Sequence, residues 1–231
     1  MLKVSIVISI LNSHEVVRRQ IKYFKSLDLP DDAEIVFIDD GSDPPLKFDT
    51  PENLRIYPSG DFRPWTMACG RNLGAQIAQG EFLLMTDIDL IVPLPAIEAV
   101  RKFNGDKMTF ANRTIAVLDE NGQITQDLDI LREHGLDDVR YKKRNLQWSR
   151  HTNSFAIRKA IFKEIGGYPI RYCHEDVVDR TSDRNFFNKY KNYSLAGKCK
   201  KQEPGPILYG YPPLSKDVPG LFHNLSREVS K

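Results

Sequence analysis

The stretch Phe82-Leu83-Leu84-Met85-Thr86-Asp87-Ile88-Asp89 is an apolar run that ends in two carboxylates separated by one residue. A run of this kind predicts a buried strand, in which successive side chains alternate between the two faces. We therefore expect Asp87 and Asp89 to point the same way and Ile88 to point into the core. Two carboxylates at one strand end suit Mg²⁺ or Mn²⁺, ions that usually hold the phosphates of a nucleotide. The same pattern also fits a strand end with two solvated acids, so the rest of the chain has to decide.

The composition describes a globular chain without a strong electrostatic field. Its 231 residues suit one α/β domain, and a net charge of +2 gives no reason to expect wrapping of nucleic acid or binding to an anionic membrane. The three cysteines are odd in number and lack a C-x-x-C spacing, which argues against a disulfide framework and a zinc site. Residues 2–11 lack the cleavage site of a secretory signal, and no stretch has the length of a transmembrane segment. We expect a reduced, cytoplasmic setting.

Strand and helix signals alternate through the first half of the chain. Residues 4–11 predict a buried strand, and Asn12 followed by Glu15 resembles a cap that opens a helix. Residues 34–38 predict a second strand, which ends in Asp39-Asp40-Gly41-Ser42. The other elements expected here are a short strand at 55–57, a helix at 70–79, the strand that carries Asp87, a helix at 95–103 and a strand at 107–111.

The second half has a mixed pattern. Residues 114–126 hold two alternating runs around Asn121-Gly122, a pair typical of a two-residue hairpin turn. Helices are expected at 158–165 and 176–190, and the Gly- and Pro-rich residues after 196 predict a loop or lid.

Both acidic clusters follow predicted strands. Asp39-Asp40 ends the second strand, and the pair Asp87 and Asp89 ends the later one. Open α/β sheets bind their ligands outside the carboxyl ends of the strands. The two placements agree with this rule, and they favour a binding site over solvated strand ends.

Short motifs from residue 4 to about residue 190 form an ordered set. They are the strand into Asn12, Ile38-Asp39-Asp40-Gly41-Ser42, Gly70-Arg71-Asn72-Leu73-Gly74, Gly80-Glu81-Phe82, Asp87-Ile88-Asp89, Asn153-Ser154-Phe155-Ala156-Ile157-Arg158, Gly166-Gly167-Tyr168 and Glu175-Asp176. In this order they resemble the GT-A glycosyltransferases of the family-2 type, and the Asp-Ile-Asp and Glu-Asp segments also resemble β-1,4-galactosyltransferases. The resemblance implies a Rossmann-like, mixed and mostly parallel sheet flanked by helices. It also implies one domain over 1–231, with a nucleotide-sugar-binding half at 1–112, an acceptor half with a β-hairpin at 113–195, and the loop or lid at 196–231.

The reaction that the resemblance implies is a metal-dependent, inverting transfer of a sugar. The donor is a nucleotide-sugar, with uridine as the expected nucleoside, and Mn²⁺ or Mg²⁺ is the expected cofactor. The acceptor is a hydroxyl on a glycan, a lipid-linked sugar or a modified base, and the sequence does not choose among these.

Donor-binding roles follow from the resemblance. Asp40, or else Asp39, is placed to accept a hydrogen bond from a ring N–H of the base, since a carboxylate is an acceptor. Asp-Gly-Ser also fits a plain turn in which the acid bonds its own backbone. Ser9 is placed to line the base pocket, and Arg71 to hold a phosphate or the base. A buried structural serine and a surface arginine are the alternatives.

Metal and acceptor roles also follow from the resemblance. Asp89 is implied as the direct metal ligand, Asp87 as the group that reaches the ribose or a metal-bound water, and His223 as a third ligand. Asp176 is implied as the base that takes the proton of the acceptor hydroxyl, next to Glu175 as a substrate-binding acid. A helix cap at 176 is the alternative. Residues 171–174 differ from the Gly and Trp of the galactosyltransferases, which leaves the acceptor open.

Other functions fit less well. Haloacid-dehalogenase-like phosphatases also have an Asp-x-Asp pair, but they usually carry Thr or Val where this chain has Ile91, and their other acids follow the pair. A sugar nucleotidyltransferase opens with a Gly-rich loop that residues 11–15 lack, and no G-x-G-x-x-G supports a dinucleotide oxidoreductase. A non-catalytic nucleotide-sugar-binding protein stays open, and for it Asp176 is dispensable.

Overall fold

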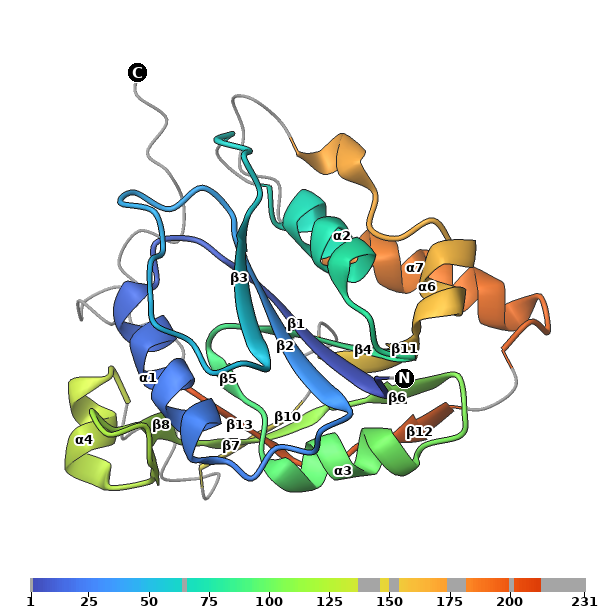
Figure 1. Ribbon diagram of the computed structural model, residues 1–231. Helices are drawn as coiled ribbons and strands as arrows, with labels where there is room; N and C mark the ends of the chain where they lie inside the picture. The colour runs from blue at the N-terminus through green and yellow to red at the C-terminus, as the bar shows by residue number, and fades with distance from the viewer. Residues whose placement is uncertain are drawn as a thin grey trace.

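A computed structural model describes residues 2–63, 66–136, 146–149, 154–173, 182–199 and 202–212. Within these residues the central sheet has seven strands in the order β12-β6-β11-β4-β1-β2-β3 (Figure 1). Strand β11 runs antiparallel to its neighbours β4 and β6, and the other neighbouring pairs of the sheet are parallel. The strands are β1 (Val4–Ile10), β2 (Ala33–Asp39), β3 (Leu54–Pro58), β4 (Phe82–Asp87), β6 (Lys107–Thr109), β11 (Phe155–Arg158) and β12 (Gln202–Pro204). The mixed, mostly parallel α/β sheet expected from the sequence is confirmed.

Helices cover both faces of this sheet (Figure 1). Helices α1 (His14–Ser26) and α3 (Leu94–Lys102) lie on one face, and α2 (Met67–Ile77), α6 (Lys159–Glu164) and α7 (Ser182–Leu195) lie on the other. A short 3₁₀ turn, η2 (Ile170–Tyr172), follows α6 in the chain and lies against α2.

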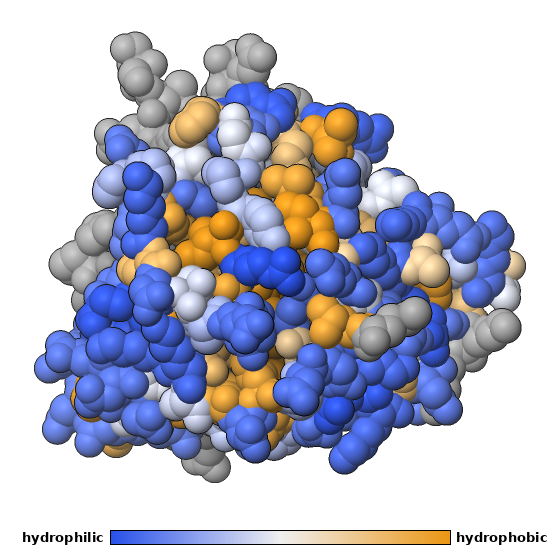
Figure 2. Space-filling view, in the orientation of Figure 1, coloured by the Kyte–Doolittle hydropathy of each residue, from blue (hydrophilic) through white to orange (hydrophobic). Residues whose placement is uncertain are grey.

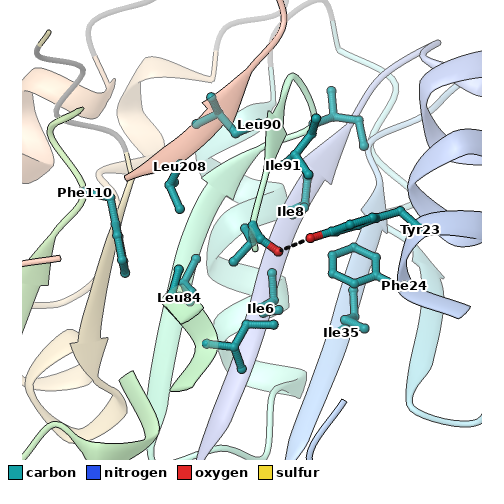
Figure 3. Close-up of a cluster of buried hydrophobic side chains, with 14 of the residues drawn as sticks. Ile6, Ile8, Tyr23, Phe24, Ile35, Leu84, Leu90, Ile91, Phe110 and Leu208 are labelled. Carbon is teal, nitrogen blue, oxygen red and sulfur yellow. Dashed lines mark hydrogen bonds between the residues drawn. The ribbon is translucent and has the colours of Figure 1, made fainter. Parts of the chain in front are cut away.

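Strict alternation in the strands produces the two hydrophobic cores. In β1, Ile6 and Ile8 pack toward α1, whereas Val7 packs toward α2, because neighbouring side chains point to opposite faces. Figure 3 shows the first core, where Tyr23 and Phe24 of α1 lie over the sheet and the Tyr23 hydroxyl donates to the Val92 carbonyl at 3.2 Å. In the second core, a Cβ added at Gly74 of α2 would lie 2.4 Å from Val7 Cγ1. Glycine therefore lets α2 approach the sheet closely.

A smaller sheet and a hairpin complete the described fold. The smaller sheet has the order β10-β7-β13-β5, built from Gln147–Ser149, Asn112–Ile115, Leu208–Gly210 and Leu90–Ile91. Strands β8 (Val117–Leu118) and β9 (Ile124–Thr125) pair antiparallel beside α4 (Leu128–Glu133). The expected hairpin is present, but Asp119 N bonds Gln123 O at 2.9 Å, so the loop is longer than two residues and has Gly122 at φ 79°. This matches a longer hairpin loop with glycine in the left-handed region.

Several local expectations differ from the structure. Asn12 does not cap α1; its φ is 53°, and its side-chain oxygen accepts from Asp43 N at 2.8 Å, so it holds the turn after β2. Strand β4 ends at Asp87, and Asp89 lies in the turn before β5, so strand alternation does not place it. The region expected as a loop or lid contains β12 and β13, which complete the two sheets because their backbones find strand partners there. Residues 213–231 lie outside the described ranges.

On the face shown in Figure 2, apolar side chains gather toward the middle and polar side chains surround them. No helix in the described ranges combines the length and the apolar character that a membrane crossing requires.

Candidate functional site

The carboxyl ends of β1, β2 and β4 bring the predicted donor residues to one edge of the sheet. Ser9 of β1 lies opposite Asp87 of β4, and Ile10 lies opposite Asp39 of β2. Asp40 continues from β2 and donates its backbone N–H to the Ile10 carbonyl at 2.7 Å. The parallel register therefore gathers the acids of 39–40 and of 87–89 around the end of β1, as the strand-end rule predicts.

The neighbouring acids Asp39 and Asp40 have different partners. Asp39 Oδ1 accepts the Ser42 backbone N–H and Oδ2 accepts that of Leu46, both at 2.8 Å. Asp39 thus holds the loop after β2. Asp40 is buried and accepts from side-chain hydroxyls, among them Ser9 Oγ at 3.4 Å. Asp39 is therefore bonded to the loop backbone, whereas the Asp40 side chain lies among side-chain hydroxyls.

Burial raises the pKa of Asp40 to about 6, although hydrogen bonds from Thr66, Ser59 and Ser9 act in the opposite direction. The nearby Asp61 adds to the rise. A carboxylate held in this way is costly to the fold at neutral pH, because the charged form is poorly solvated. Such a group is a candidate for a role other than stability.

We expect Asp40→Asn to raise the free energy of unfolding at pH 8 by up to about 3 kcal/mol, since each pKa unit corresponds to about 1.4 kcal/mol. The folded state takes up a proton near pH 6 and the unfolded state near pH 4, so wild-type stability falls as pH rises through this window. The gain from the variant should therefore disappear below about pH 4. Urea denaturation at pH 4 and pH 8 measures both values, and equal differences at the two pH values would contradict the assignment.

Glycine at position 70 allows α2 to approach this acid. A Cβ added there would lie 2.5 Å from Ser9 Oγ and 3.3 Å from Asp40 Oδ1. The first turn of α2 is thus in close contact with the candidate base pocket, and its backbone has no room for a side chain.

Arg71 connects the strand end to the second half of the chain. Its guanidinium is fully buried, donates to Asp87 Oδ1 and to Asp183 Oδ1, and lies 5.1 Å from the centre of the Tyr168 ring. The planar fork of arginine suits two carboxylates at once. Arg71 is therefore not the surface residue of the alternative interpretation, and in this structure it positions Asp87.

Asn72, the next residue of the Gly-Arg-Asn motif, binds the backbone of the Gly-Gly-Tyr motif through its side chain. Its amide donates to the Tyr168 carbonyl and its oxygen accepts the Tyr168 N–H, both at 2.9 Å. A Cβ added at Gly167 would lie 2.5 Å from Asn72 Oδ1, which explains glycine there. The two motifs form one unit, in which Asn72 holds the backbone that carries the Tyr168 ring against Arg71.

Asp89 lies beside Asp87 in an unusual environment. Its Oδ1 is buried and, among the described residues, has no hydrogen-bond partner. Burial and the charge of Asp87 raise the pKa of Asp89, against the attraction of Arg113. Burial also lowers the pKa of Arg113, although the charges of Asp89 and Asp87 act to raise it. A buried carboxylate oxygen without a hydrogen-bond donor is a position at which a cation supplies the missing compensation.

Other predicted residues lie outside the described ranges. These are Glu175, Asp176 and His223. In the described ranges, no three histidine, cysteine or acidic side chains come together in a way that fits a metal ion.

The structure adds residues that the sequence did not indicate. The charge of Arg113 in β7 interacts with those of Asp87 and Asp89, and Asp183 of α7 accepts a hydrogen bond from Arg71. Cys69 and Cys173, which the sequence treats as scattered, have their sulfur atoms 3.1 Å apart. Each pair joins segments far apart in the chain, and no local motif marks them.

Comparisons with known proteins agree with the fold. No family model matches the sequence, and no curated protein is similar to it. The chain is similar to the crystal structure of TarS from S. aureus, with a TM-score of 0.58 at 14% identity over 91% of this chain and 37% of that one. A TarS fragment, residues 1–349, in complex with UDP-GlcNAc gives a TM-score of 0.57 at 14% identity over 94% of this chain and 60% of that one.

The mannosyltransferase PcManGT from Pyrobaculum calidifontis, in complex with GDP-Man and Mn²⁺, gives a TM-score of 0.52 at 16% identity, over 94% of this chain and 58% of that one. The chain thus spans between about a third and three fifths of the length of these structures. The local likeness to β-1,4-galactosyltransferases stays a prediction. The chain has the GT-A fold of these glycosyltransferase structures.

Proposed function

We propose that this protein is a metal-dependent, inverting glycosyltransferase that moves a sugar from a nucleotide-sugar, with uridine as the nucleoside, to a hydroxyl acceptor. The observation that carries the proposal is the gathering of Asp40, Asp87 and Asp89 at the carboxyl edge of the parallel sheet. Nucleotide ligands bind at this edge in α/β folds. The similar structures include complexes with UDP-GlcNAc and with GDP-Man, which supports the same ligand class here.

The residues present fit a divalent cation. Asp89 Oδ1 is buried and has no hydrogen-bond partner in the described part of the chain, and it is a hard oxygen ligand of the kind that Mg²⁺ and Mn²⁺ prefer. Asp87 is fixed by Arg71 and adds a second carboxylate beside it. A bound cation supplies positive charge that stabilises the nucleoside diphosphate as it leaves. The Mn²⁺ in the PcManGT complex supports this assignment, and His223 is proposed as a further ligand.

Asp40 and Ser9 form the proposed base pocket. A carboxylate in a buried pocket discriminates a ring N–H donor from an acceptor, because a wrong partner leaves a buried charge unpaired. Uracil presents such an N–H. The raised pKa of Asp40, about 6, also predicts that nucleotide binding weakens as pH falls below that value, since protonation removes the charged acceptor.

The acceptor side is assigned to Asp176 and Glu175. In an inverting transfer a base takes the proton of the acceptor hydroxyl during in-line attack on the anomeric carbon, which Asp176 is proposed to do. Residues 1–112 then bind the donor, and residues 113–195 contribute the acceptor side.

Asp176→Asn tests the catalytic part of the proposal. We expect sugar transfer to fall at least about 10²-fold, the usual effect of removing a general base. The affinity for UDP in the presence of Mn²⁺ should stay near that of the wild type, since the substitution leaves the donor residues intact. Transfer is measured as released UDP, and binding by calorimetry. Full activity of the variant would contradict the assignment of Asp176 as the base and would favour a non-catalytic role for this residue.

A further inference from the structure

The only sulfur pair among the described residues lies next to the candidate base pocket. Cys69 is in the first turn of α2 and Cys173 follows η2, and their sulfur atoms are 3.1 Å apart, with Cys69 donating its S–H. The residues are 104 positions apart in the chain. Both are free thiols in the structure. Cys69 directly precedes Gly70, which packs against Ser9 and Asp40.

The surroundings of the pair hold it in place. Arg63 donates to the Cys173 carbonyl at 2.8 Å and lies 3.7 Å from Cys69 Sγ. Asp61 in turn binds the Arg63 guanidinium. The Cys173 backbone N–H donates to the Ile170 carbonyl at 2.9 Å. These contacts hold the Cys173 backbone and place the Arg63 guanidinium beside the sulfur pair.

We propose that Cys69 and Cys173 form a redox modification site, which hydrogen peroxide converts into a disulfide at the edge of the nucleotide pocket. In the first step the Cys173 thiolate attacks one peroxide oxygen, the O–O bond breaks, and hydroxide leaves. The product is a sulfenic acid on Cys173. In the second step the Cys69 sulfur attacks Cys173 Sγ, the S–O bond breaks, and the proton of the Cys69 thiol passes to the departing hydroxide, which leaves as water. Two thiols and one peroxide thus give one disulfide and two waters.

The environment supports this order of attack. The S–H of Cys69 lowers the pKa of the Cys173 thiol, and the Arg63 guanidinium adds to this, although burial opposes it. A thiolate next to a cation is the reactive form toward peroxide, and a second thiol within reach resolves the sulfenic acid. In a reducing compartment the disulfides that do form are usually transient, and they form between reactive cysteines of this kind.

Oxidation also has a geometric consequence. The sulfur atoms must close from 3.1 Å to about 2.05 Å, and the new bond then ties the first turn of α2 to Cys173, the residue after η2. Gly70 has no spare room against Ser9 and Asp40. We therefore expect the disulfide to weaken nucleotide binding reversibly, a consequence that rests on the proposed function.

The test treats the full chain with hydrogen peroxide under native conditions, followed by thiol counting and non-reducing peptide mapping. Free thiols should fall from three to one, and a linked pair of tryptic peptides, 56–71 with 172–180, should appear and disappear with dithiothreitol. Cys69→Ser and Cys173→Ser should each abolish the link, whereas Cys199→Ser should keep it. A link that involves Cys199, or oxidation to sulfinic acids without a link, overturns the proposal. The wild-type peptide map decides this even if a serine variant fails to fold.

A second readout separates this site from the proposed function. The dissociation constant of UDP with Mn²⁺ should rise on oxidation and return on reduction. If the link forms but UDP binds neither form, the redox site stands and the proposed function fails. If UDP binds equally well to both forms, the coupling between the two sites is overturned.

Discussion

Replacing Asp89 by asparagine is expected to lower the rate of sugar transfer at least about 10³-fold, because a bound cation contributes several kcal/mol to the stabilisation of developing charge. The same substitution should remove the cation-dependent part of nucleotide binding. An amide is a weak ligand for a hard cation, and it has no charge with which to hold one.

The fold is expected to tolerate this substitution. Asp89 has a buried oxygen without a partner among the described residues, and burial and Asp87 raise its pKa. A neutral side chain therefore relieves the repulsion between the acids and should not lower stability. Loss of function without loss of stability is the pattern of a ligand, whereas a purely structural acid would lose stability.

The control is Asp49→Asn, because Asp49 is an exposed acid that pairs only with Lys25 among the contacts described. Its effect on transfer should be negligible. Transfer is followed as released UDP at saturating Mn²⁺, and cation binding by titration calorimetry. If Asp89→Asn keeps its Mn²⁺ affinity and its rate, the metal assignment is wrong.

Replacing Arg71 by methionine is expected to lower the free energy of unfolding by about 3 kcal/mol, toward the low end for removing one partner of a buried ion pair. Asp87 and Asp183 then lose their shared cation, and the partial exposure of their side chains limits the cost. Nucleotide binding with Mn²⁺ should also weaken, because the Asp87 carboxylate is no longer held. Arg71→Lys should recover part of the stability, since it restores the charge but not the two-pronged geometry.

Arg101→Met is the matched control for Arg71→Met. Arg101 also binds two acids, Asp32 and Glu98, but at the protein surface, where water replaces the lost contact. Its effect on stability should be much smaller and its effect on nucleotide binding absent. Urea denaturation at pH 7 compares the variants. Equal losses for Arg71→Met and Arg101→Met would show that the buried network has no special role.

The local residue pattern correctly predicts the strands at the centre of the sheet and the acids at their carboxyl ends. Alternating apolar residues in β1, β2 and β4 define the strands, and the acids that follow β2 and β4 mark the edge where ligands bind. Asn12 shows the limit of this approach. Its sequence context fits a helix cap, but tertiary contacts decide that it holds the turn at Asp43 instead.

Long-range partners are the part that the sequence could not provide. The pairs Arg71 with Asp183 and Cys69 with Cys173 are each more than 100 positions apart, and no residue type or spacing along the chain links them. The strands β12 and β13 were missed for a related reason. Their Gly- and Pro-rich sequence predicts a loop. These residues form strands because their backbones pair with the neighbouring strands β6 and β7, which the local sequence does not show.

Thermal unfolding with a panel of nucleotide sugars, each with Mn²⁺ and with EDTA, is the most direct test of the proposed donor site. A ligand that binds only the folded state at about 100 times its dissociation constant adds about 2.7 kcal/mol of stability. We expect at least one uridine-linked sugar to raise the melting temperature with Mn²⁺, EDTA to remove the shift, and Asp40→Asn to reduce it. If no nucleotide sugar raises the melting temperature in Mn²⁺, or if the shift is unchanged by EDTA, a metal-assisted nucleotide-sugar site at this sheet edge is contradicted.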